Sequence, residues 1–452
     1  MQRDHETIMS SAIRSDVSSL FKISFPVMLS TLSTHIMMFL DRVILVRYDL
    51  EAMNSAAASM MSVAVFQCGA MGVAAISEVF VGRHNGAKEL TAVGSAVWQM
   101  IWFSMMLFVV SVPIAIYGSA LIIPQELAFY GVPYFKWIMA FSPLAAVGAA
   151  FSGFYIGVGK THYITLSVVV GNIVNIVLAV ILIFGIQGFV PSFGIRGAAF
   201  ASIIGALVQC LLLCYWFLKS KNRLLYHTMK WRIYPLVMWQ EIKMGGPQAL
   251  GHAIEVTAWA FTFHLVAPLG MAFVTVLTVC QSVILTIYFM LEGLQKGVIG
   301  VASNLIGAKK LSEIKILLKS SLKLYIVILF IIAIPMLVVG KQLVVAIFIT
   351  DHKAIELINQ VTIGLRWMFL FCVFDGLVWI FSGIIVAGGD TKFVMLVNAA
   401  NTWLFSIVPL YFLTKVSFIE PHMMSLFTAL YALINAMCFA LRYKSLGWLK
   451  VS

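Results

Sequence analysis

Two carboxylates stand inside long apolar stretches of this sequence, where ionisable side chains are rare. Glu255 lies near the middle of residues 246–270, and Asp375 lies inside residues 360–386. A charged residue at membrane depth costs roughly 2.5–3.5 kcal/mol on insertion scales, so it normally faces a protein interior or a water-filled cavity. The two acids fall at a similar depth along their stretches. Such a pair can bind Na⁺ through its oxygens, or share a proton because two like charges disfavour each other.

Helical spacing places polar and polarisable side chains on the same faces as these acids. Residues three and four apart share one face of a helix. The faces that carry Glu255, Asp375 and a third acid, Asp41, also hold His252, Trp259, Phe371, Trp379 and Met37. Aromatic rings and methionine can hold flat organic cations by dispersion and cation–π contact. We therefore predict that the acids couple to a cation and that their neighbours line a substrate cavity.

A fixed basic partner would give each acid a structural role instead. For Glu255 and Asp375 the candidate bases are His252, Lys296 and Arg366. We favour the functional interpretation, because acids inside membrane segments are functional by default.

For two further pairs of charged residues we consider both a functional and a structural interpretation. Arg42 directly follows Asp41, so a structural ion pair and a functional acid weigh equally there. Glu292 and Lys296 are four residues apart, in the favourable order for a helix salt bridge. We predict that this pair is structural.

The elements that position these residues are membrane-spanning helices. The chain has 452 residues, of which 62% are hydrophobic and 11% are charged, and its mean hydropathy is +1.00. Soluble domains are about 45–50% apolar and about 25% charged, so we expect an all-α integral membrane protein. Charges, Pro and Gly divide the chain into twelve predicted spans: 20–46, 54–80, 95–118, 133–157, 164–186, 197–218, 246–270, 273–300, 321–345, 360–386, 394–414 and 422–442.

The net charge of +12 is explained by topology rather than by nucleic-acid binding. If the N-terminus is inside, most Lys and Arg residues fall at the inner ends of the spans, which fixes both termini in the cytoplasm. The six cysteines contain no C-x-x-C pair and no H-E-x-x-H motif occurs. We therefore expect no cofactor and no metal beyond Na⁺ at Glu255 and Asp375.

The second half of the chain repeats the first. At an offset of 221 residues, Pro26 corresponds to Pro247, and the tripeptide GAK at 86–88 corresponds to GAK at 307–309. Six spans per half is an even number, so the two halves share one orientation and relate by a pseudo-twofold axis along the membrane normal. The predicted divisions are a tail at 1–19, a six-helix lobe at 20–218, a basic cytoplasmic linker at 219–244, a second six-helix lobe at 245–442, and a tail at 443–452.

Several short motifs follow one another in a recognisable order. They are the spacing from Pro26 to Asp41, GAK at 86–88, NIVNIVLAVILIFG at 172–185, GIRGAAFAS at 194–202, PQALGHAIEVT at 247–257 and FDGLVWIFSGIIVAGGDTK at 374–392. This order, together with the two-lobed layout, resembles the multidrug and toxic compound extrusion (MATE) family in its NorM-type bacterial branch. The resemblance implies a V-shaped antiporter that exports drugs while Na⁺ or H⁺ enters.

The resemblance also implies roles for particular residues. Acids of the C-terminal lobe that hold the coupling cation match Glu255 and Asp375, the family's first-helix acid matches Asp41, and its fifth-helix Asn matches Asn175. We therefore add Asn175 to the candidate substrate cavity. This chain departs from the pattern at Phe371, where an aromatic hydroxyl often stands.

The resulting prediction is a cation-coupled (Na⁺ or H⁺) multidrug efflux antiporter, not an enzyme, in the cytoplasmic membrane. Its expected partners are small organic substrates, favouring cations, together with Na⁺ or H⁺ and the lipid bilayer, and we expect a monomer. The alternative is a flippase or exporter of a lipid-linked or polysaccharide precursor in the same superfamily. An intramembrane aspartyl enzyme is disfavoured because Asp41 and Asp375 lack G-x-G-D contexts.

Overall fold

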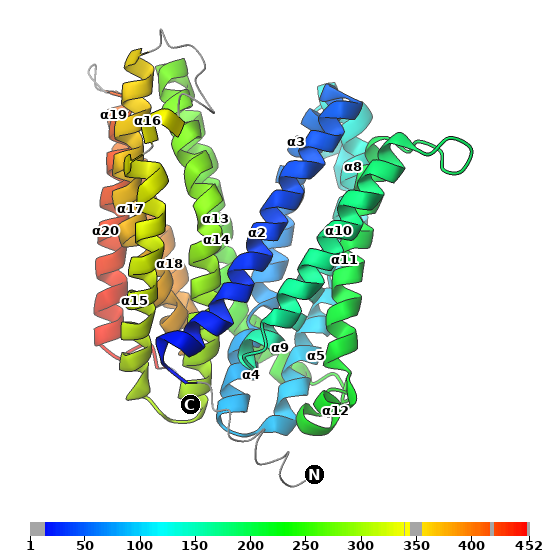
Figure 1. Ribbon diagram of the computed structural model, residues 1–452, viewed down its shortest axis with the longest axis vertical. Coiled ribbons are helices and arrows are strands. Elements are labelled where there is room, and N and C mark those ends of the chain that lie inside the picture. The colour runs from blue at the N-terminus through cyan, green and yellow to red at the C-terminus, as the bar shows by residue number, and fades with distance from the viewer. Residues whose placement is uncertain (1–13, 339, 344–354, 416–419, 450–452) are drawn as a thin grey trace. The chain divides into compact units, whose positions relative to one another are not determined.

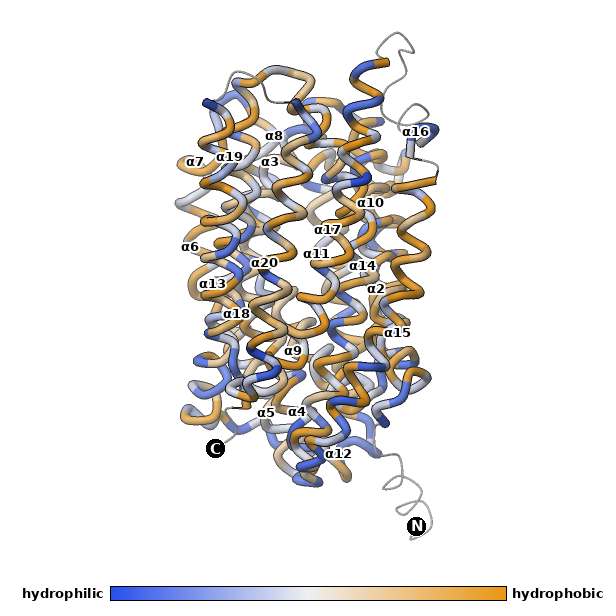
Figure 2. Tube along the Cα trace, turned by 90° about the vertical axis from the view of Figure 1, so that its left-hand side faces the viewer, coloured by the Kyte–Doolittle hydropathy of each residue, from blue (hydrophilic) through white to orange (hydrophobic). Residues whose placement is uncertain are grey.

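A computed structural model describes residues 14–338, 340–343, 355–415 and 420–449 of the chain. Within these ranges the protein is helical throughout, apart from one isolated antiparallel bridge between Ile186 and Val190. Eleven of the described helical segments are long and apolar enough to cross a bilayer. Apolar residues run along the middle of the helices, and polar residues gather toward their ends (Figure 2). The twelfth segment, Pro235–Val266, has sufficient length and carries the polar face of Glu255.

The described helices match the twelve predicted spans, although their bounds differ by several residues, and residues 339, 344 and 345 of the predicted ninth span lie outside the described residues. The first six are α2 (Val17–Tyr48), α3 (Leu50–Ala74) with α4 (Ser77–Gly86), α5 (Leu90–Met106) with α6 (Phe108–Pro113) and α7 (Ser119–Ile122), α8 (Ala128–Phe141) with α9 (Pro143–Gly157), α10 (His162–Phe184) and α11 (Ile195–Phe217). After the short α12 (Ser220–Tyr226) come α13 (Pro235–Val266), α14 (Met271–Gly307), α15 (Glu313–Ala333), α16 (Gly340–Leu343), α17 (Ile355–Ala387), α18 (Thr391–Thr402) with α19 (Val408–Leu413), and α20 (Met423–Lys444).

The chain folds into two compact units, and the divisions between them fall inside α2, α13 and α14 and after residue 310. Of the described residues, the first unit holds 25–249 and 303–310, and the second holds 14–24, 250–302 and the rest from 311 onward. The predicted basic linker at 219–244 groups with the first unit, because its residues contact α5. Within this segment α13 already begins at Pro235. Proline is favourable at the first helical position, where its missing N–H costs nothing.

The repeat at offset 221 is visible in the backbone of two turns. The turn after α4 and the turn after α14 are each closed by an N–H bonded to the carbonyl four residues earlier, at 2.8 Å for Ala87 and 2.9 Å for Ala308. The next residue is left-handed in both turns, with φ of 62° at Lys88 and 59° at Lys309. The two GAK tripeptides therefore have the same conformation, which supports a duplicated architecture.

Two other features also occur at equivalent places in both halves of the chain. Gly159 and Gly389 end their helices with φ of 73° and 92°, a region that favours glycine. The third and ninth spans each contain a π-helical turn, at Ile114–Gly118 and Ile334–Val338. π-turns are rare and usually mark functional or mechanically special positions. Their recurrence shows that the duplication reaches beyond the loops.

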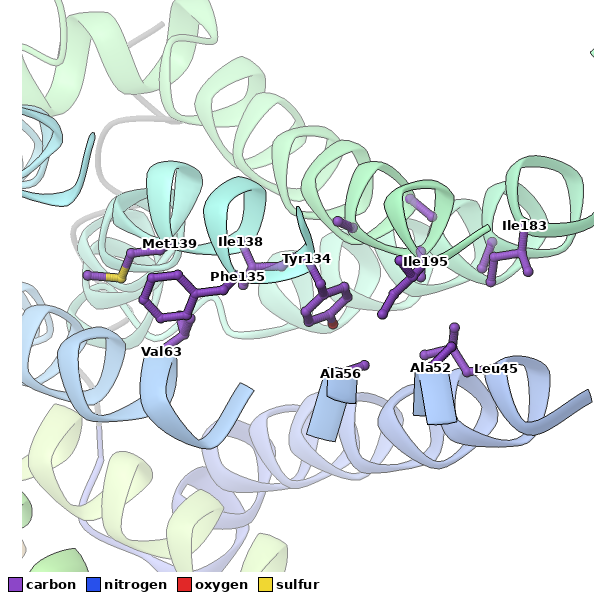
Figure 3. Packing of buried hydrophobic residues seen from close by; sticks show 14 of the residues in the cluster. Leu45, Ala52, Ala56, Val63, Tyr134, Phe135, Ile138, Met139, Ile183 and Ile195 are labelled. Carbon is purple, nitrogen blue, oxygen red and sulfur yellow. The ribbon is translucent and has the colours of Figure 1, made fainter. Parts of the chain in front are cut away.

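The core of the first unit lies between α2, α3, α8, α10 and α11. Figure 3 shows Tyr134 of α8 facing the small Ala56 of α3, and Phe135 of α8 beside Val63 of α3. Alanine at position 56 lets the Tyr134 ring approach the α3 backbone closely. The Ser59 hydroxyl adds a 3.2 Å hydrogen bond to the Gly131 carbonyl between the same helices.

In the second unit, α17 packs against both α20 and α15 (Figure 1). Amide side chains join α18 to α20, since Asn401 Nδ2 donates to Asn435 Oδ1 at 3.0 Å and Asn435 Nδ2 donates to Asn398 Oδ1 at 2.9 Å. Buried amides of this kind need partners, because an unpaired polar group in an apolar interior is costly. These bonds fix the helices that surround the candidate site.

Candidate functional site

Asp375 is a buried carboxylate held by two hydrogen-bond donors. It lies in the middle of α17 and is 8% exposed. Trp379 Nε1, one turn later, donates to Asp375 Oδ2 at 2.8 Å, and the Tyr288 hydroxyl of α14 donates to the same oxygen at 3.3 Å. Donors aimed at one carboxylate oxygen stabilise its ionised form. The predicted acid is therefore buried inside the second unit, with two donors on one of its oxygens.

Tyr288 is a site residue that the sequence did not identify. Its ring also packs edge-on against Trp379, with 5.8 Å between the ring centroids. Periodicity on α17 could place Trp379 beside Asp375, but nothing local indicates which face of α14 turns toward them. Tyr288 supplies the hydroxyl that Phe371 cannot. Phe371 itself is 1% exposed and serves packing, not the lining of either cavity described below.

Glu255 opens into a small cavity of about 30 Å³ within the second unit. Trp259, a predicted cavity residue, lines it together with Glu255 and Thr262 of α13, and Thr402 and Tyr431 contribute from the facing helices. The Thr402 hydroxyl donates to the Tyr431 oxygen at 3.1 Å. A space of this size holds a small ion or a water molecule rather than an organic substrate.

The second unit brings the two predicted acids into one electrostatic neighbourhood. Glu255 and Asp375 interact through space, and Tyr288 and Tyr431 both lie within range of the two carboxylates. His252 Nδ1 lies 3.8 Å from Glu255 Oε2, and the His252 side chain is 54% exposed. This contact is long and solvent-exposed, so His252 stabilises the Glu255 carboxylate only weakly and does not hold it in a fixed ion pair.

Asp41 belongs to the first unit and is not part of the Glu255 cavity. It is half-buried in α2, with Tyr134 of α8 as an electrostatic neighbour. Within the described ranges its carboxylate forms no ion pair or hydrogen bond, and the adjacent Arg42 points to an exposed position. The structural pair of Asp41 with Arg42 is therefore absent from this structure.

A second cavity, of about 240 Å³, lies between α2 and α10 of the first unit. Met37, a predicted cavity residue, lines it together with Ser33 and Asn172, and Asn172 Nδ2 donates to Ser33 Oγ at 2.9 Å. Asn175 does not line it: this side chain is 3% exposed and donates to Ser202 Oγ of α11 at 3.2 Å. Asn175 therefore lies outside this cavity, with its side chain toward α11.

The predicted salt bridge between Glu292 and Lys296 is not formed. Both side chains are half-buried on α14, and in the described part of the chain Glu292 makes no ion pair or hydrogen bond. A spacing of four permits such a pair without compelling it, since a partly hydrated pair gains little free energy. Across the same residues, no group of three or more His, Cys, Asp or Glu side chains is arranged to hold a metal ion.

Comparison with known proteins gives a consistent family. The MatE family model matches residues 26–181 and 247–412, which begin at the two repeated prolines. A probable multidrug resistance protein NorM of Mannheimia succiniciproducens is 23% identical over 424 residues, covering 90% of this chain and 88% of that protein. The probable multidrug resistance protein YoeA of Bacillus subtilis is 22% identical and covers 66% of each chain.

Solved structures show the same fold. A MATE crystal structure in the straight conformation superimposes with a TM-score of 0.87 at 16% identity, covering 97% of this chain and 98% of that one. A transporter of the MOP superfamily from Pyrococcus furiosus, described as having reversed binding-pocket polarity, gives a TM-score of 0.84 at 16% identity over 98% of both chains. The chain therefore belongs to the MatE family of membrane transporters and is of the NorM type.

Proposed function

We propose that this protein is an antiporter that exports organic compounds, with a preference for cations, in exchange for Na⁺ or H⁺. Its curated relatives carry multidrug resistance names, and its fold is that of MATE transporters. We place it in the cytoplasmic membrane as a monomer with both termini inside and no cofactor. The Lys and Arg residues at the inner span ends support this orientation.

The observation that carries the proposal is the buried Asp375 carboxylate, which interacts electrostatically with Glu255. Among the described residues, Asp375 accepts hydrogen bonds from Tyr288 of α14 and Trp379 of α17, which stabilise its charge. A cation that reaches Glu255 and Asp375 discharges them and weakens those two bonds. Because Tyr288 belongs to α14 while Asp375 and Trp379 belong to α17, discharge weakens the Tyr288 hydrogen bond that joins the two helices.

Exchange requires that cation and substrate disfavour each other, a coupling that is reciprocal. The Glu255 cavity, of about 30 Å³, admits an ion but no organic compound. The substrate therefore binds elsewhere, and the two ligands favour different conformations of the helices. Met37, in the larger cavity of the first unit, is a candidate contact for the substrate.

The test is dye efflux from vesicles with sodium and proton gradients imposed separately. We expect Asp375→Asn and Glu255→Gln to abolish ion-driven efflux while insertion and thermal unfolding stay unchanged. Glu292→Gln is the matched control, because it removes a half-buried acid of α14 that has no described partner. Efflux that survives in either site variant removes the mechanism.

A flippase or exporter of a lipid-linked precursor is the second candidate. It is favoured by the apolar lining of the first-unit cavity, where aliphatic side chains outnumber the polar ones. Translocation of a headgroup-labelled lipid in proteoliposomes, undiminished in Asp375→Asn, would support this candidate over the antiporter.

A further inference from the structure

One end of the first unit carries exposed basic and apolar side chains in alternation. The chain leaves α11, forms α12, runs through residues 227–234 and enters α13 (Figure 1). Between positions 219 and 240 there is no acid. Five exposed bases occur there, and we refer to them with their apolar neighbours as the basic surface: Lys219, Lys221, Arg223, Lys230 and Arg232.

The apolar members of the basic surface are as exposed as the bases. Leu224 is 79% exposed and Leu236 is 80% exposed, while Trp231 and Trp239 are 62% and 63% exposed. An apolar patch of this kind on a folded protein marks a site of association with another apolar phase. Bases interleaved with Trp and Leu are the composition of segments that lie in the membrane interface.

The basic surface is held rigidly on α5. Trp98 Nε1 donates to the Thr228 carbonyl at 2.8 Å, and Trp102 Nε1 donates to the Trp231 carbonyl at 2.8 Å. The rings of Trp102 and Trp231 stack with 6.2 Å between centroids. The segment is therefore a fixed part of the unit, with its side chains presented in one arrangement.

Close backbone contact adds to this rigidity. A Cβ at Gly94 of α5 would lie 2.6 Å from the Tyr226 carbonyl oxygen, so only glycine allows the segment to sit so near. The Gln99 side chain holds residues 232–234 of the same segment, because it accepts a hydrogen bond from the Tyr234 N–H at 2.8 Å and donates one to the Arg232 carbonyl at 3.0 Å. These contacts fix the segment more firmly than a simple connection between α11 and α13 requires.

Carboxylates of the described residues do not neutralise the positive charge of the basic surface. None of its five bases forms an ion pair with any residue that the structure describes. Arg232 instead lies 5.9 Å over the ring of Tyr234. Burial, with a further contribution from the nearby Lys221, lowers the pKa of Lys160 in the turn between α9 and α10. An anion placed here would meet several cations that form no ion pair with a described carboxylate.

We propose that the basic surface binds anionic phospholipid headgroups of the adjoining bilayer leaflet. Lysine and arginine contact the lipid phosphates, and Leu236 and Trp239 enter the boundary between headgroups and acyl chains. A membrane surface fits better than a soluble anion, because large apolar side chains stand among the bases at the ends of membrane-spanning helices. The interaction is independent of the transported substrate.

The experiment compares spin-labelled phosphatidylglycerol with spin-labelled phosphatidylcholine around the full chain in phosphatidylcholine nanodiscs. We expect roughly tenfold tighter association of the anionic lipid, since each base near an anionic surface adds to the attraction. The variant Lys221→Gln/Lys230→Gln/Arg232→Gln should reduce this preference to within about twofold of unity. Unchanged thermal unfolding shows that the variant is folded.

The matched control removes the same charge elsewhere. Lys315→Gln/Lys319→Gln/Lys323→Gln deletes three exposed bases of α15 and should keep most of the preference. An equal loss in this control overturns the proposal, because the effect is then general charge attraction. Displacement of the labelled lipid by inorganic phosphate at constant ionic strength also overturns it, since the site then recognises a free anion.

A second variant tests the apolar part. Leu236→Gln/Trp239→Gln keeps every base, and we expect it to weaken lipid association by at least about threefold. An unchanged association would show that the interleaved apolar side chains play no part, and that result also overturns the proposal.

Discussion

Trp379 Nε1 and Tyr288 Oη both donate to the same oxygen of Asp375, at 2.8 and 3.3 Å, from two different helices. The charge of Asp375 therefore strengthens the contact between α14 and α17. Loss of this charge weakens both hydrogen bonds at once. The Tyr288 bond, which joins the two helices, then no longer holds them together as firmly.

Removing the indole donor should make the coupling ion bind more tightly. Trp379→Phe keeps an aromatic side chain but deletes the hydrogen bond from the indole to a charged group, and such a bond is worth about 1.5–3 kcal/mol. The ionised, empty form of Asp375 loses that stabilisation. The ion concentration for half-maximal efflux should therefore fall by roughly tenfold. Trp137→Phe, at a 40% exposed tryptophan, is the control and should change nothing; a rise in the required ion concentration would contradict the prediction.

Substituting the glycine of either GAK turn should destabilise the first unit. A Cβ at Gly86 would lie 2.0 Å from the Asn304 carbonyl oxygen, and one at Gly307 would lie 2.0 Å from that of Arg83. Both obstacles are backbone, so Gly86→Ala should lower the free energy of unfolding by about 3 kcal/mol or more. Thermal unfolding in detergent measures this.

Gly69→Ala is the matched control, because a Cβ there meets nothing within 4 Å. It should raise stability by up to about 1 kcal/mol, since alanine favours the helix over glycine. Equal unfolding temperatures for the Gly86 and Gly69 variants would show that the two segments are not in close contact.

The ion pair between Arg442 and Asp390 should show unequal costs for its two halves. Arg442 Nη2 and Nε donate to Asp390 Oδ2 at 2.6 and 2.9 Å, and the side chains are 27% and 0% exposed. Arg442→Gln leaves a buried carboxylate without its guanidinium and should cost about 3–5 kcal/mol. Asp390→Asn leaves a partly hydrated arginine and should cost less.

Chemical denaturation of the purified protein can measure both variants of this pair. Arg14→Gln is the control, because its pair with Asp16 is exposed and should contribute nothing measurable. A larger loss for Asp390→Asn than for Arg442→Gln would reverse the assignment of the buried partner.

Gln99 should determine whether the basic surface stays docked. Gln99→Leu removes both hydrogen bonds to residues 232 and 234 and leaves two backbone groups without partners. Local opening should become roughly tenfold more frequent, given about 1–3 kcal/mol for such a loss. Trypsin cleavage at Lys230 and Arg232 should accelerate accordingly. Gln240→Leu, at an exposed position, should cleave at the wild-type rate.

The sequence by itself determined the membrane class, the twelve spans and the duplication. Long apolar segments can satisfy their backbone in a bilayer only as helices, so their number follows from composition. The repeated GAK tripeptide implied a repeated turn, and Lys88 and Lys309 have matching left-handed conformations. The cost of an acid in an apolar stretch singled out Glu255 and Asp375 before any fold was known.

Only the tertiary structure decided which helices face one another. Periodicity fixes the face of a residue on its own helix, but the neighbour across that face depends on long-range packing. Tyr288, eighty-seven positions from Asp375 in the chain, therefore could not be found from spacing. For the same reason spacing could not show that Asn172 rather than Asn175 lines the cavity beside α2, or that the segment before α13 packs on α5.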